Sequence, residues 1–118
     1  MYGLKSTEDL SFMLNACVSQ IVVSQSALKI DFDQQIRLTI FSTFAMKIAD
    51  QAMMQFNGST EDAAALFPLI GDVITAAKAT TSGGLHLNFK SGALLEVFDD
   101  SKQYESFTIS NGDQLIVA

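Results

Sequence analysis

The chain has 118 residues, of which 48% are hydrophobic and 17% are charged, and thirteen acidic residues outnumber seven basic ones to give a net charge of −6. This composition excludes a disordered, collagen-like or coiled-coil chain, and it favours one domain over residues 1–118. The negative charge makes nucleic acids and anionic membrane surfaces unfavourable partners, because both repel carboxylates.

The first half of the chain begins with a helix signal and continues with strand signals. Hydroxyl and acidic residues at positions 6–9 precede apolar residues at helical spacing, which predicts a short helix. An apolar run at 21–23 predicts a strand. Alternating apolar and polar residues at 28–32 and 36–40 predict two more strands, joined as a hairpin through the polar turn at 33–35.

The middle of the chain has the least regular pattern. Residues 44–56 fit both a helix and a strand, and we favour a strand that ends near Asp50. The segment 59–62 repeats the helix-start pattern, so a second short helix is expected there. That helix should end around Pro68, because proline disfavours helical geometry in the residue before it.

The last part of the chain alternates as a series of short strands separated by glycine-containing or polar turns. Asn111-Gly112 is a strong hairpin signal, because both residue types tolerate positive φ. The fold class predicted from all segments is α+β: a predominantly antiparallel β sandwich or half-barrel with two short helices. The strands expected in this part are 73–79, 85–90, 93–98, 107–110 and 114–117.

The pattern of apolar residues in 7–41 returns in 62–98. Two explanations stay open: an internal duplication, and the general similarity of any two amphipathic hairpins. A duplication would give two related halves that pack through a common core. The residues that match at a spacing of 57 positions are Leu28, Ile30, Phe32, Leu38, Ile40 and Phe41 with Leu85, Leu87, Phe89, Leu95, Val97 and Phe98.

Residue types that usually carry catalysis are nearly absent. His86 is the only histidine and Cys17 the only cysteine, and nothing in the sequence marks a partner that would make a nucleophilic pair or a metal site of them. Gly83-Gly84 is too short, and too poor in flanking lysine or serine, for a phosphate-binding loop. We therefore expect a protein that is not an enzyme and that has no catalytic residue, metal or cofactor.

Cysteine usage and the start of the chain bear on the compartment. A single cysteine cannot form a disulfide within the chain, which is typical of a reducing environment. The first residues include Glu8 and Asp9 where a secretory signal would be apolar, and the apolar stretch 63–77 is too short for a membrane span of about 20 residues. A cytoplasmic protein without a membrane partner is expected.

Acidic residues gather near the C-terminal end, where Lys102 is the single opposing cation between positions 96 and 113. Carboxylates on one surface speed the encounter with a basic protein, and they mimic the phosphates of a nucleic acid. A charged rim that only maintains solubility is the alternative. The candidate partner-binding residues are these acids and two nearby aromatic residues: Glu96, Phe98, Asp99, Asp100, Tyr104, Glu105 and Asp113.

Two strings in the C-terminal half carry a family resemblance: Leu85-x-Leu87-x-Phe89-x-x-Gly92-x-x-Leu95-x-Val97 and Tyr104-Glu105-Ser106-Phe107-x-Ile109. Together with Leu69-x-Gly71-x-Val73 they cover residues 69–109, where the chain resembles small bacterial immunity proteins of polymorphic toxin systems, including contact-dependent growth inhibition. The resemblance implies a protein that binds a cognate toxin domain, such as a basic nuclease, and neutralises it by covering its active site. It makes Tyr104 and Glu105 candidate contact residues.

Two other functions stay open. A small-ligand binding β domain without catalytic activity would hold its ligand between the two halves, in a pocket lined by residues such as Phe41, Phe89 and Phe98. A hydrolase would have to use His86, for which the sequence offers only the presence of one imidazole. The oligomeric state does not follow from any of these patterns.

Overall fold

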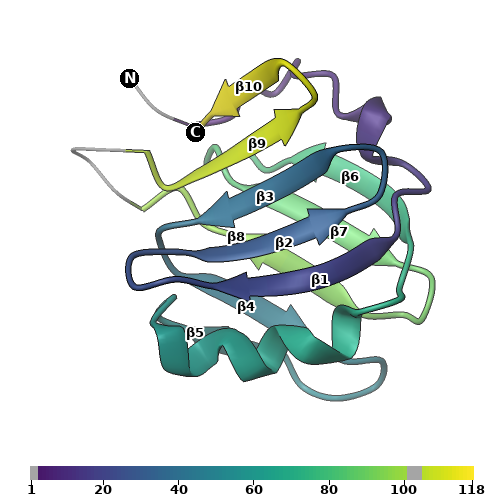
Figure 1. Cartoon of the computed structure of the whole chain (residues 1–118), viewed down its shortest axis with the longest axis vertical. Helices are drawn as coiled ribbons and strands as arrows, with labels where there is room; N and C mark the ends of the chain where they lie inside the picture. The colour runs from purple at the N-terminus through teal and green to yellow at the C-terminus, as the bar shows by residue number, and fades with distance from the viewer. Residues whose placement is uncertain (1–2, 101–104) are drawn as a thin grey trace.

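A computed structural model of the chain describes residues 3–100 and 105–118. Two five-stranded sheets with antiparallel pairing make up most of the molecule, and they stack face to face (Figure 1). The predominantly antiparallel β architecture expected from the alternating pattern is therefore confirmed.

The first sheet takes strands from both ends of the chain. In spatial order it contains β1 (Val18–Val23), β2 (Leu28–Phe32), β3 (Ile36–Ile40), β9 (Phe107–Asn111) and β10 (Gln114–Val117). The second sheet contains β5 (Met54–Phe56), β4 (Phe44–Lys47), β8 (Leu94–Val97), β7 (Leu85–Phe89) and β6 (Ile74–Ala79).

The core lies between the two sheets, and the period of two along each strand produces it. In β2 and β7 every second residue is buried, while the residues between them face outward. Leu38 and Leu95 continue these inward rows on the neighbouring strands β3 and β8. The polar side chains of both sheets are thus displayed on the two outer faces, where a binding site can form.

Both helical segments are 3-10 helices. They are η1 (Ser11–Met13) and η2 (Thr60–Leu69), and η2 continues through Pro68. The buried residues of η2 are Ala63, Leu66 and Leu69, and a spacing of three places them on one face of a helix with three residues per turn. The described residues form no α-helix, so the architecture is mainly β rather than the α+β expected. Neither helix has the length and hydropathy needed to cross a bilayer within the described part of the chain.

Most of the expected strands are present, with differences at two turns. The segment 44–56 forms a hairpin, because the strand that begins at Phe44 ends at Lys47 and a second strand follows. In the last hairpin Asn111 pairs with Gln114. The two turn residues are therefore Gly112 and Asp113, with φ +60° at Gly112, instead of Asn111 and Gly112.

Candidate functional site

Two connections between the sheets meet at one end of the sandwich. Residues 41–43 lead from β3 to β4, and the chain leaves β8 through residues 98–100. The Ser42 hydroxyl donates to the Phe98 carbonyl oxygen at 2.9 Å, and the Phe98 N–H donates to the Thr43 carbonyl oxygen at 3.1 Å. These bonds hold the two connections side by side.

The segment before η2 joins the same end. A Cβ atom on Gly58, whose φ is +82°, would lie 2.2 Å from the Ser42 carbonyl oxygen, so only glycine fits against this backbone. Asp62 then accepts hydrogen bonds from the Asn57 N–H at 3.0 Å and from the Ser59 hydroxyl at 3.2 Å. The tight turn places the start of η2, which carries Glu61 and Asp62, at the same end of the molecule as the connections.

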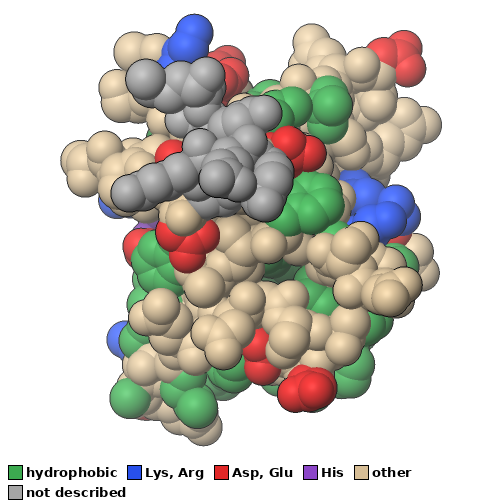
Figure 2. Space-filling model, turned by 90° about the vertical axis from the view of Figure 1, so that its left-hand side faces the viewer, with side chains coloured by type: hydrophobic (Ala, Val, Ile, Leu, Met, Phe, Trp, Pro, Cys, Tyr) green, Lys and Arg blue, Asp and Glu red, His purple; other side chains and the backbone are tan. Residues whose placement is uncertain are grey.

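We call the surface that results the acidic end surface. Phe41 is its most exposed apolar side chain, at 43% exposure, and its N–H donates to the Ser106 carbonyl oxygen at 2.9 Å. Figure 2 shows acidic side chains and hydrophobic patches on this side of the molecule, with lysine and arginine side chains toward its margins. The surface consists of Phe41, Glu61, Asp62, Phe98, Asp99, Asp100 and Glu105.

Two neighbouring carboxylates on this surface have different surroundings. Asp99 is half-buried, and one of its oxygens accepts a hydrogen bond at 3.2 Å from the hydroxyl of the fully buried Ser106. Its other oxygen lies against Gly83, where an added Cβ would be 2.9 Å away. Asp100 is exposed and accepts a hydrogen bond from the Thr43 hydroxyl. Asp99 therefore fastens the connection, whereas Asp100 faces solvent.

The structure brings together some of the residues predicted for partner binding and separates others. Phe98, Asp99, Asp100 and Glu105 lie at the acidic end surface, and Tyr104 lies outside the described residues. Because side chains alternate along β8, Glu96 points to the outer face of the second sheet, where its Oε1 lies 3.4 Å from Nδ1 of His86.

Asp113 lies at the far end of its hairpin from the acidic end surface. The neighbouring Gly112 N–H donates to the carbonyl oxygen of Gln35, in the turn between β2 and β3. Strand β9 runs from Phe107 to Asn111, just before the turn at Gly112 and Asp113, and spans about 13 Å. Closeness in sequence therefore did not place all the predicted carboxylates on one surface.

Three residues of the acidic end surface were not predicted. Phe41 follows the buried Ile40, so it breaks the alternation by placing an aromatic residue in the outward position, and this was the available signal. Glu61 and Asp62 were interpreted only as the start of a helix. Their place at this end of the molecule depends on the contact between Gly58 and Ser42, which no local sequence pattern predicts.

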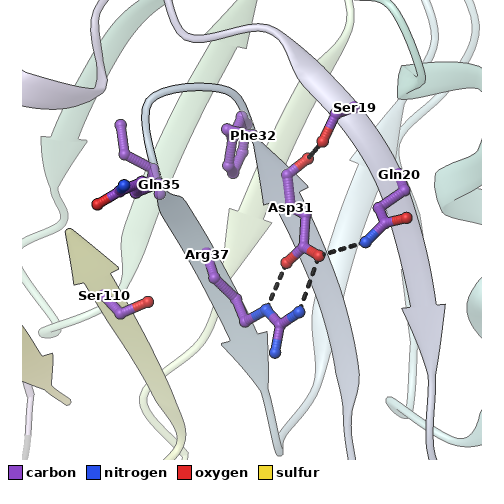
Figure 3. A pocket seen from close by; sticks show the side chains of 8 residues that line it. Ser19, Gln20, Asp31, Phe32, Gln35, Arg37 and Ser110 are labelled. Atoms are coloured by element: carbon purple, nitrogen blue, oxygen red, sulfur yellow. Dashed lines mark hydrogen bonds and ion pairs between the residues drawn. The ribbon is translucent and has the colours of Figure 1, made fainter. Parts of the chain in front are cut away.

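A second candidate site lies on the outer face of the first sheet (Figure 3). The Arg37 Nη2 donates to Asp31 Oδ2 at 2.8 Å, and its Nε donates to the other carboxylate oxygen. Gln20 Nε2 donates to Asp31 Oδ2 at 2.7 Å. The pair borders a hollow of about 390 Å³ that is lined by Ser19, Gln20, Asp31, Phe32, Gln35, Ile36, Arg37 and Ser110.

The ion pair changes the titration of both partners. The hydrogen bonds from the Arg37 guanidinium hold the pKa of Asp31 below its ordinary value, and they raise the pKa of Arg37. The Asp31 side chain is 14% exposed and the Arg37 side chain 42%. The remaining guanidinium nitrogen points away from Asp31, so it can donate to a ligand (Figure 3).

The second sheet shows that the fold does not need this ion pair. Asp31 pairs with Arg37 between β2 and β3, and the corresponding pair between β7 and β8 is Asn88 with Leu94. The strands of the second sheet follow the corresponding order, and strands β7 and β8 pair without an ion pair at this position. The ion pair beside the hollow is therefore specific to the first sheet.

Metal-binding side chains are dispersed. Within residues 3–100 and 105–118, histidine, cysteine, aspartate and glutamate side chains form no group of three or more that could hold a metal ion. Cys17 is a half-buried thiol that forms no disulfide, and its backbone forms an isolated bridge with Val73.

Comparison with known protein families gives a match over most of the chain. The model of the Family of unknown function (DUF6188) matches residues 11–118. No curated protein and no solved structure matches the chain.

Proposed function

The chain belongs to the family of unknown function DUF6188, and we propose that it is a non-catalytic protein that binds a basic protein partner through the acidic end surface. The observation that carries the proposal is that three segments of the chain meet at one end of the sandwich, joined by the contacts of Ser42 with Phe98 and with Gly58, and that they carry the acidic and aromatic side chains of this surface. The resemblance described above supplies the partner class: a toxin domain, such as a nuclease, that this chain neutralises as an immunity protein in the cytoplasm.

Charged and apolar side chains contribute to different steps of binding at such a surface. The carboxylates attract a basic partner over distance and raise the association rate, while the aromatic side chains supply affinity once water is excluded. One partner of a standard interface covers about 800 Å², a small share of the 6508 Å² accessible surface of this molecule.

The neutralising mechanism follows from the same charges. A nuclease binds phosphates with lysine and arginine side chains, and exposed carboxylates such as Glu61 and Asp100 would occupy those cations in place of phosphates. Covering the substrate groove needs no chemistry from the bound protein. The proposal is thus consistent with a chain that contributes binding alone.

The deciding experiment mixes the purified chain with the protein encoded immediately upstream of it. Calorimetry should show a one-to-one complex, and the activity of that protein on DNA or RNA should fall in proportion to the complex formed. Asp113→Lys serves as a matched control, because Asp113 is exposed but lies away from the acidic end surface. Absence of a complex, or full toxin activity within it, would contradict the proposal.

A second candidate function is binding of a small polar ligand in the hollow beside Arg37. The observation that favours it is the absence of an equivalent ion pair at Asn88 and Leu94. A ligand with carboxylate or hydroxyl oxygens suits the outward nitrogen of Arg37 and the Ser110 hydroxyl. In a thermal-shift screen of sugars and carboxylic acids, a true ligand at about 100 times its Kd adds roughly 2.7 kcal/mol. Arg37→Leu should abolish the shift, and an equal shift in that variant would exclude this site.

A further inference from the structure

The two sheets are built in the same way from the two halves of the chain. In the first sheet β1, β2 and β3 lie side by side, and in the second β6, β7 and β8 do. Each sheet has a register shift at the same place, between Val18 and Gln20 in β1 and between Ile74 and Ala76 in β6. At each shift a hydroxyl side chain donates to a carbonyl oxygen of the next strand, from Ser19 at 3.0 Å and from Thr75 at 3.3 Å.

An approximate two-fold axis passes between Cys17 and Val73, which form an isolated antiparallel bridge. The Val18 N–H donates to the Asp72 carbonyl oxygen, and the Ile74 N–H donates to the Ala16 carbonyl oxygen, both at 2.9 Å. A rotation that places residues 16–18 onto 72–74, and 72–74 onto 16–18, converts each of these two hydrogen bonds into the other. The correspondence of the halves therefore includes the contact between them. A gene duplication over 7–41 and 62–98 stays a prediction about origin.

The remaining hairpins are exchanged between the sheets. The β4–β5 hairpin follows β3 in the chain but pairs with β8 of the second sheet, and the β9–β10 hairpin follows β8 but pairs with β3 of the first (Figure 1). The registers correspond, because Phe44 pairs with Val97 and Phe107 pairs with Ile40. Each half of the chain therefore completes the sheet that the other half begins.

The exchanged hairpins contribute to the shared core. Phe44 and Phe107 are fully buried, as is Ile109, and Met46 is 3% exposed. Without its partner's hairpin, each three-stranded sheet would expose these contacts and the edge of its third strand to water, a state that invites pairing with another strand. The edges of β3 and β8 are thus surfaces that fit the opposite half.

We infer that the chain is a fused pseudo-dimer with exchanged hairpins, in which residues up to Phe56 and residues from Asn57 hold each other without the need for the covalent link. The interaction surface of each half is the edge of its third strand together with its inner face. Its partner is the other half of this chain. This inference is independent of the proposed function, since it concerns contacts inside the molecule.

The test cuts the full chain under native conditions. A flexible insert with a protease site is placed between Phe56 and Asn57, which leaves the Asn57 contact with Asp62 intact. After cleavage, the protein should elute from a sizing column where the uncut insertion variant does, while denaturing mass spectrometry shows two pieces. Pieces that separate or precipitate would overturn the inference. If the insertion prevents folding, the cut is made between Asp50 and Gln51, in an exposed loop; this moves β5 into the second piece, so β4 alone then has to hold the first piece to the second sheet, and co-elution or separation of the pieces is read in the same way.

Variants of the cut protein test whether both hairpins hold the pieces together. Met46→Ala removes a buried side chain from one exchanged hairpin and Ile109→Ala from the other, and each should raise the Kd between the pieces by roughly thirty-fold or more. Lys29→Ala, on the outer face of β2, is the control and should leave the Kd unchanged. An effect of only one of the two core variants would contradict a mutual exchange.

Discussion

The Asp100 carboxylate accepts a hydrogen bond from the Thr43 hydroxyl, and this contact joins residues 57 positions apart at the place where the chain passes between its two sheets. Connections of this kind place charged and aromatic side chains from distant segments on one surface. The connections 41–43 and 98–100, which carry the chain from one sheet to the other, also position the acidic end surface.

Charge reversal at the acidic end surface should slow association with the basic partner. Asp100→Lys and Glu61→Lys change exposed side chains, so we expect an association rate about tenfold lower at low ionic strength and nearly unchanged near 1 M salt, where screening acts within about 3 Å. Stopped-flow or surface-plasmon kinetics measure this. Asp113→Lys is the matched control, and equal losses in all three variants at every salt concentration would argue against local attraction.

Removal of the Asp99 carboxylate should destabilise the fold rather than only the complex. Asp99→Ala removes the carboxylate oxygen that accepts from the fully buried Ser106 hydroxyl at 3.2 Å, and we expect the free energy of unfolding to fall by about 1 kcal/mol for this one hydrogen bond. Thr43→Val removes the exposed hydrogen bond to Asp100 and should cost less. Urea denaturation of both variants compares them, and a larger loss in Thr43→Val would reverse this assignment.

Acid should weaken the ion pair on the outer face of the first sheet. The Arg37 guanidinium lowers the pKa of Asp31 in the folded protein, so the unfolded chain binds the proton more readily. The stabilisation is therefore present above the ordinary aspartate pKa of about 3.9 and is lost as the pH falls through the lower folded value.

Asp31→Asn tests the size of this stabilisation. Because Arg37 is partly exposed, we expect the variant to be less stable than the parent by only about 0.5–1 kcal/mol at neutral pH, with the difference shrinking as the pH falls below the ordinary aspartate pKa of about 3.9. Thermal unfolding of both proteins across this range measures it. A stability difference that grows toward acid would contradict the direction of the Asp31 shift.

Gly58 and Gly71 have similar φ angles, so replacing each with alanine separates the steric cost of an added Cβ from its conformational cost. Gly58 has φ +82° and its Cβ position lies 2.2 Å from the Ser42 carbonyl oxygen, whereas Gly71 has φ +88° and nothing within 4 Å. Gly71→Ala should cost about 1–2 kcal/mol for the positive φ alone, and Gly58→Ala should cost more because the backbone must also move. Chemical denaturation ranks them, and an equal loss would remove the role given to the Gly58 contact.

Local patterns predicted the strands well because alternation of apolar residues depends only on neighbours in sequence. Leu28, Ile30 and Phe32 face the core as their spacing requires. The helix type was missed, since the prediction rested on the hydroxyl and acidic residues at 59–62, whereas the spacing of three among the buried residues of η2 suits a 3-10 helix.

The candidate site was predicted only in part because long-range contacts build it. Phe98, Asp99 and Asp100 lie together because they are consecutive in one connection. Glu61 joins them through a turn packed on Ser42, a residue 56 positions from Phe98, and no periodicity encodes such a contact. Conversely, Asp113 is separated from them by the whole length of a strand.

The most direct test of the binding account is a hydrogen-exchange footprint of the complex with the protein encoded upstream. Binding at the acidic end surface predicts slower amide exchange in residues 41–43, 57–62 and 98–100, and unchanged exchange in the β2–β3 turn at 33–35. Slower exchange confined to that turn, or to the outer face around Arg37, would contradict the account.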